Sequence, residues 1–186
     1  MYQSNTKLAA TLIALLFLGA WGCSATRPHV EAPEPGPVLT QYPDQGHDHL
    51  PHPDFPHPPY ASNPPTSGPH TPYTTHWGMH ERPLRWEVAL HNMEHGGIVA
   101  AYRCSPCKQM VATLTELHGV YPMMIIAHEP NLDAPLVFAA WRHTLSVPRL
   151  DEPGWRAIKA FFDEHYAVDH HPMSGSHPHS AAPTDP

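Results

Sequence analysis

The sequence predicts a small α+β domain, in which a mixed sheet of about four strands, in the order β-β-α-β-β-α, is covered by two helices. One observation is a set of apolar runs of strand length at residues 98–102, 123–127 and 136–141. Another is a pair of segments whose apolar residues recur every three or four positions, which is typical of amphipathic helices. These patterns confine the compact domain to residues 73–166.

The first two strands are predicted from different patterns. A half-buried strand is predicted at residues 86–91, because Trp86, Val88 and Leu90 recur at every second position there. Residues 98–102 are apolar throughout, as expected for a strand that is buried on both faces.

The remaining elements follow from helix signals and further apolar runs. A helix is expected to open at Pro106, because proline is favoured in the first turn, and to stop at Gly119. Residues 123–127 and 136–141 predict two more strands. Asp151 is a suitable N-cap for the last helix.

The composition limits the classes of function. The chain has 186 residues, and its 25 prolines exceed the average share of roughly 5%, so the folded part is smaller than the chain. A net charge of −7 argues against a nucleic-acid partner held through phosphate contacts. The 18 histidines are the unusual feature, since imidazole is the commonest metal ligand.

The N-terminus has the features of an export signal. The apolar run from Leu8 to Ala20 is too short for a spanning helix, and residues 1–22 read as a signal peptide. Its end resembles a bacterial lipobox, which predicts lipidation of Cys23; the alternative is an ordinary cleaved signal that leaves a free thiol there. Because Ser24 follows instead of aspartate, we expect a lipid-anchored protein of the cell envelope, on the periplasmic face of the outer membrane.

Three further segments are rich in proline and polar residues. Residues 23–41 read as a spacer, and residues 42–72 as a stiff, extended arm that could deliver His49 or His70 to the domain. Residues 167–186 form a histidine-rich tail that is expected to be disordered and to bind metal weakly at most.

Two motifs carry a family resemblance. Residues 64–70 (PPTSGPH) and 91–97 (HNMEHGG) resemble the bacterial family known as domain of unknown function 3105, over about residues 42–166. The resemblance implies an exported or membrane-tethered protein and supplies no activity. It implies a cysteine pair, matched by Cys104 and Cys107, and it marks as positions of interest His49, Tyr60, His70, His91, Glu94 and His95.

The second motif suggests a metal site. We expect His91, His95 and Glu94 to lie in a turn between two strands, with His70 or His49 completing a copper or zinc site. The same groups could instead form a hydrogen-bonded brace that pins the arm to the sheet. The spacing also fits an inverted zinc-peptidase motif, but that mechanism needs a long helix, and glycines and a strand follow at once.

The cysteines allow three interpretations. Cys104 and Cys107 end a buried strand and open a helix, which resembles the thioredoxin motif and suggests a thioredoxin-like half domain. A structural disulfide is favoured over redox catalysis in an oxidising compartment, and a soft metal site on both thiolates is the third possibility.

Taken together, these features predict a membrane-anchored lipoprotein that binds copper or zinc and is not an enzyme. The alternatives are a thiol-disulfide oxidoreductase acting through Cys104 and Cys107, or a structural envelope module that binds an unknown protein partner and no metal.

Overall fold

The computed structural model describes residues 35–171. The predicted signal peptide, the lipidation at Cys23 and residues 172–186 of the predicted tail lie outside the described residues. Within residues 35–171, none of the helices is both long and apolar enough to cross a membrane.

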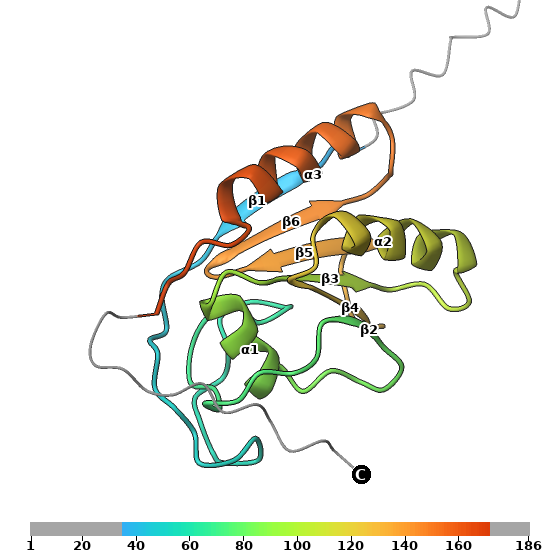
Figure 1. The fold of residues 1–186 in the computed structure, drawn as a ribbon. Coiled ribbons are helices and arrows are strands. Elements are labelled where there is room, and N and C mark those ends of the chain that lie inside the picture. Colours follow the sequence, from blue (N-terminus) through green and yellow to red (C-terminus); the bar gives the residue numbers. More distant parts are fainter. Residues whose placement is uncertain (1–34, 172–186) are drawn as a thin grey trace, which may run out of the picture. The chain divides into compact units, whose positions relative to one another are not determined.

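One mixed sheet of six strands forms the centre of the described region, in the order β1-β6-β5-β3-β4-β2 (Figure 1). β2, β3 and β4 are parallel, and β5, β6 and β1 continue the sheet by antiparallel pairing. The strands are Val38–Gln41 (β1), Gly78–His80 (β2), Ile98–Tyr102 (β3), Met124–His128 (β4), Leu136–Ala140 (β5) and His143–Val147 (β6). The α+β class and the mixed sheet are confirmed, but the predicted number of four strands is too low.

Three helices are present in the described region: Trp86–Glu94 (α1), Lys108–Val120 (α2) and Glu152–His165 (α3). α2 and α3 were predicted, and Asp151 caps α3 by accepting a hydrogen bond from the backbone N–H of Gly154 at 3.0 Å. The strand predicted at residues 86–91 is wrong, because these residues belong to α1. Ala89, Leu90 and Met93 form its buried apolar face, and this helical spacing prevails over the short alternation.

The helices cover both faces of the sheet, with α2 and α3 on one side and α1 on the other (Figure 1). β3 shows why, since successive residues of the strand pack in different hydrophobic clusters on the two faces of the sheet. Ile98, Ala100 and Tyr102 pack in the cluster that includes residues of α2 and α3, while Val99 packs with α1 and Trp141. The central strand is therefore buried on both faces, as its unbroken apolar sequence predicted.

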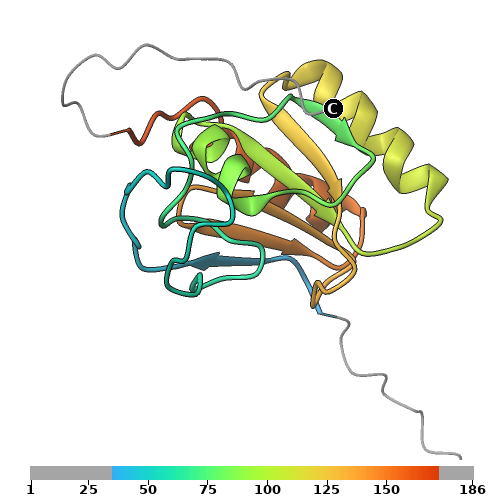
Figure 2. The same cartoon turned by 90° about the horizontal axis from the view of Figure 1, so that it is seen from below.

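Residues 42–77 form a largely irregular segment that lies on the same face as α1 (Figure 2). Backbone hydrogen bonds fasten it to the domain, from Thr71 N to Glu87 O at 2.7 Å and from Arg142 N to Thr66 O at 2.8 Å. The preceding strand, β1, falls within the range assigned to the spacer and pairs with β6. The arm is thus part of the folded domain.

Candidate metal centre

The HNMEHGG motif forms the last turn and the end of α1. Gly96 N donates to Met93 O at 3.0 Å and Gly97 N donates to Asn92 O at 2.8 Å, the two bonds of a Schellman helix end. Gly96 has φ +85°, in the left-handed region that favours glycine. The expected turn between two strands is therefore wrong.

The arm presents two histidines to this helix end. Residues 46–50 and 68–70 run side by side in parallel, with a bridge between His49 and His70. His70 N donates to Asp48 O at 3.0 Å, and Leu50 N donates to His70 O at 2.6 Å. Nearby, the Tyr60 hydroxyl donates to Pro69 O at 2.7 Å, so Tyr60 supports the backbone beside His70.

Four side chains converge where the arm meets α1: His49, His70, His91 and Glu94. One potential ligand atom from each lies within 4.8 Å of the others. His70, His91 and Glu94 are buried, whereas His49 is exposed. The group therefore has a buried interior and one ligand at the surface.

The carboxylate of Glu94 lies at the centre of this group, with no exposed side-chain surface. Its Oε2 is 3.2 Å from His70 Nε2 and 3.4 Å from His91 Nδ1, and its Oε1 is 2.5 Å from His47 Nδ1. Burial alone would raise the pKa of Glu94, but hydrogen bonds from His70 and His47 lower it to about 2. Glu94 is thus a carboxylate, not a carboxylic acid, at neutral pH.

The imidazole of His91 is neutral at the same pH. Burial, followed by the neighbouring imidazoles of His70 and His95, lowers the pKa of His91 to about 3. Its Nδ1 is buried and makes no hydrogen bond in the described structure. A neutral imidazole with a buried nitrogen of this kind is ready to bind a metal ion.

His70 is oriented by the backbone. Its Nδ1 lies 2.8 Å from Gly68 O, which fixes Nδ1 as the donor and leaves the lone pair of a neutral ring on Nε2. Gly68 has φ +120°, and a Cβ there would meet the ring of Tyr60 at 3.3 Å. The glycine of the PPTSGPH motif therefore permits the close turn that aims His70 at Glu94.

His47 also contacts the site, although the sequence did not single it out. It hydrogen-bonds to Glu94 and stacks on Trp141, with ring centroids 4.8 Å apart. No periodicity in the histidine-rich arm distinguishes His47 from its neighbours, so no sequence signal pointed to it. His47 contacts Oε1 of Glu94, whereas His70 faces Oε2.

His95 lies in a second group with Glu94 and His171, whose potential ligand atoms are likewise within 4.8 Å of one another. His171 was also missed, because it falls in the tail expected to be disordered. That expectation is wrong for residues 167–171, which the structure places against α1: Ala167 N donates to Gly96 O at 2.8 Å, and His170 N donates to Glu94 O at 2.7 Å.

The predicted site residues thus divide between two groups that share Glu94. The metal-site prediction named His49, His70, His91, Glu94 and His95, and the first four form one group while His95 joins the other. His91 and His95 lie at the end of the nine-residue α1, where His95 is the C-cap residue and β3 begins just after Gly96 and Gly97, so the long helix that a peptidase needs is not formed here. Glu94 also stands among the histidines as a potential ligand instead of apart from them as a base.

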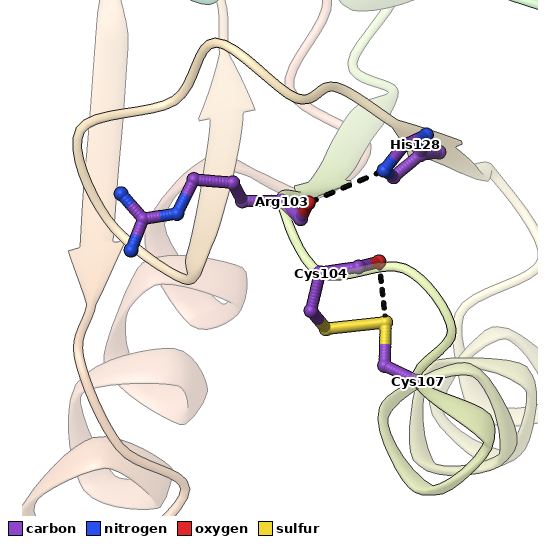
Figure 3. The surroundings of a disulfide bond; sticks show 4 residues. All are labelled: Arg103, Cys104, Cys107 and His128. Carbon is purple, nitrogen blue, oxygen red and sulfur yellow. Dashed lines mark hydrogen bonds between the residues drawn. A yellow bond between two sulfur atoms is a disulfide. The ribbon is translucent and has the colours of Figure 1, made fainter.

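Cys104 and Cys107 form a disulfide between β3 and α2 (Figure 3). The bond joins the strand end to the residue that precedes α2. Both cysteines are only partly buried, and His128 Nε2 lies 3.2 Å from Arg103 O beside them. The predicted disulfide is confirmed, and it leaves no thiolate pair for a soft metal ion.

The comparison with family models agrees with the resemblance carried by the two sequence motifs. Residues 57–182 match the family model described as "Protein of unknown function (DUF3105)", and the chain belongs to this family. Neither the comparison with curated proteins nor that with solved structures gave a match. The chemistry of the site must therefore come from its own residues.

Proposed function

We propose that this protein is an exported, membrane-anchored protein that binds a transition metal ion through His49, His70, His91 and Glu94. The observation that carries the proposal is the convergence of these four potential ligands on one largely buried point. They come from three separate stretches of the chain, two in the arm and one at the end of α1. Such a convergence of long-range contacts requires the fold, so it differs from a flexible histidine-rich tract.

The alternative is a polar brace with no metal, and the geometry at His70 bears on it. Neutral His70 would present a lone pair at Nε2, and the carboxylate of Glu94 has only lone pairs to offer at 3.2 Å. Either a proton or a metal ion must lie between these two atoms. A proton would satisfy that contact but would leave His91 Nδ1 without a hydrogen bond, whereas a metal ion could bind both imidazoles and the carboxylate.

We propose copper or zinc as the metal. Three imidazoles and one carboxylate are intermediate to hard ligands, and imidazole suits zinc, copper, iron and nickel. The described cysteines are held in the disulfide, so no thiolate of the described region selects cuprous ion. Three protein imidazoles also match known catalytic zinc sites, but nothing in this group acts as a separate base, and binding is the function it supports.

Metal titration tests the proposal. Isothermal calorimetry with Zn²⁺ and with Cu²⁺ should show stoichiometric binding to the wild-type chain. His91→Gln and His70→Gln should each weaken it at least about 10-fold, since each removes one direct ligand and the second-shell changes alone cost about 10- to 100-fold. His52→Gln, which replaces an exposed histidine outside both groups, is the matched control.

Thermal melting of the same variants separates the brace from the metal site. A brace predicts that His91→Gln and His70→Gln lower the melting temperature equally with and without added metal. A metal site predicts that wild type gains about 2.7 kcal/mol at a free metal concentration 100 times Kd, and that the variants lose this gain. Stoichiometric binding that survives both substitutions would overturn the proposal.

The membrane anchor is a separate part of the proposal, supported by the place of Cys23 directly after the apolar run. Cys23→Ala should move the protein from the membrane fraction to the soluble fraction of the envelope. If the variant stays membrane-bound, the lipobox interpretation is wrong.

A second candidate function, thiol-disulfide exchange, is favoured by one specific observation. The disulfide lies between β3 and α2, and β3 pairs in parallel with the next strand, β4, in a β-α-β unit. This supports a thioredoxin-like arrangement in that half of the domain. Redox titration decides between catalysis and a structural role, because a potential below about −300 mV is typical of structural disulfides.

A further inference from the structure

We propose that Glu94 bridges two metal ions, and that His95 and His171 hold the second one. This inference rests on the proposed metal-binding function and adds a second ion to it. The first group is His49, His70, His91 and Glu94, and the second is Glu94, His95 and His171. Glu94 is the residue that the two groups have in common.

A single carboxylate can serve both groups because it has two oxygens. In two-metal sites the ions lie about 3.5–4 Å apart, and a carboxylate that binds one ion on each oxygen spans that distance. Oε2 of the buried Glu94 faces His70 and His91, and Oε1, which hydrogen-bonds to His47, has a second lone pair for an ion of the other group. Glu94 is therefore placed to bind both ions at once.

The imidazoles of the two groups form one continuous cluster. The ring centroids of His91 and His95 are 4.8 Å apart, and those of His95 and His171 are 5.2 Å apart. His49 closes the cluster from the arm, 5.2 Å from His91 and 6.3 Å from His171. Five histidines thus surround one carboxylate, more than a single four-coordinate ion can use.

Asp169 orients the second group. Its Oδ1 lies 3.3 Å from His95 Nδ1, the carboxylate–imidazole pairing that commonly accompanies a metal-ligating histidine. The pairing places the ring proton on Nδ1 and directs the lone pair on Nε2 toward the metal. Asp169 Oδ1 also accepts from His171 N at 2.9 Å, so one side chain sets both histidines of the group.

The backbone contacts of the C-terminal segment explain why His171 is at the site. His170 N donates to the carbonyl oxygen of Glu94, the residue whose side chain would bridge the ions. Ala167 N donates to Gly96 O, and a Cβ on Gly96 would lie 2.6 Å from Val168 N. The glycine after His95 is thus needed for the segment to pass close enough to bring His171 to Glu94.

Binding stoichiometry tests the bridge. The full-length chain carrying His177→Ala and His179→Ala, which removes the two tail histidines that follow the described residues, should bind two equivalents of Zn²⁺ or Cu²⁺. His171→Ala should reduce this to one, and Asp169→Asn should weaken the second equivalent by about 10- to 100-fold. His52→Ala should leave both equivalents unchanged.

Electron paramagnetic resonance of the copper-loaded protein reports directly on the bridge. Two Cu²⁺ ions joined by Glu94 should couple, so the integrated signal at two equivalents should fall well below the copper added. The His171→Ala variant with one equivalent should give the full signal. Because His171 is only partly buried, its removal should change the melting temperature of the metal-free protein little.

The outcomes separate the two proposals. A single equivalent in wild type that is unaffected by His171→Ala would overturn the bridge and leave the metal-binding proposal standing. Two equivalents with an uncoupled copper signal would also overturn it, because the ions would then lie apart. Absence of any stoichiometric binding would overturn both.

Discussion

Gly96→Ala is the substitution with the clearest expected consequence, because the structure shows what the added methyl group meets. The Cβ would lie 2.6 Å from Val168 N and 2.7 Å from Ala167 C. Both are backbone atoms, so no side-chain rotation relieves the contact. The segment that carries Asp169 and His171 must therefore move away from α1.

The magnitude follows from two contributions. Alanine at φ +85° costs about 1–2 kcal/mol in the left-handed region. Displacing the segment removes the hydrogen bonds from Ala167 N to Gly96 O and from His170 N to Glu94 O, at about 1 kcal/mol each. We expect a loss of about 3–4 kcal/mol, which lowers the melting temperature by roughly 10 °C at about 2–4 °C per kcal/mol.

Thermal melting and metal titration measure the two effects of Gly96→Ala in one preparation. The matched control is Gly119→Ala, because Gly119 lies within α2 and a Cβ there meets nothing within 4 Å. That control should gain about 0.5–1 kcal/mol, the usual advantage of alanine over glycine in a helix. If Gly96→Ala melts like wild type, or keeps a second metal equivalent, the argument that this glycine seats the C-terminal segment is refuted.

Three other predictions concern stability. In the folded, metal-free protein the pKa of His91 is lowered from 6.5 to about 3 and that of Glu94 from 4.5 to about 2, so the unfolded state binds more protons. Stability should therefore fall as the pH drops below 6.5, through His91, and again below 4.5, through Glu94. Urea midpoints that stay constant from pH 7 to 4 would contradict this. Replacing Cys104 and Cys107 by serine should cost about 2 kcal/mol for this short loop, measured by urea denaturation, and an unchanged midpoint would show that the clip is dispensable. Asp151→Ala should cost about 1 kcal/mol through loss of the α3 cap, whereas Asp151→Asn should retain most of it.

The parts of the fold that the sequence predicted are those with strong hydrophobic patterns. β3, β4 and β5 are apolar runs, and α2 and α3 have clear helical spacing. β6 was not predicted, because the hairpin turn before it contains Arg142 at φ 64° in place of the glycine or asparagine that signals such a turn. β1 and β2 are short edge strands that bury little and so leave little pattern.

The site could be predicted only in part, for a related reason. The HNMEHGG and PPTSGPH motifs drew attention to His70, His91 and Glu94, and the structure brings these three together. The contacts of His47 and His171 depend on tertiary docking, and His47 meets Glu94 across 47 residues of sequence. Local periodicity carries no information about such contacts, so histidines of the arm and tail that reach the site could not be told from those that do not.

The last turn of α1 links metal binding to the docking of the C-terminal segment. Glu94 contributes its carboxylate to both ligand groups and its carbonyl oxygen to His170 N, while Gly96 admits the segment. Binding of the second ion needs His171, and His171 reaches the site only when the C-terminal segment is docked. Because linkage is reciprocal, the ion must stabilise the docked segment by the same free energy that docking adds to the binding of the ion. The first group depends on the arm and α1 alone, and its ion should persist when the segment leaves. The proposed centre therefore has an inner ion, held by the folded domain, and an outer ion, whose exchange is governed by a short segment at the surface.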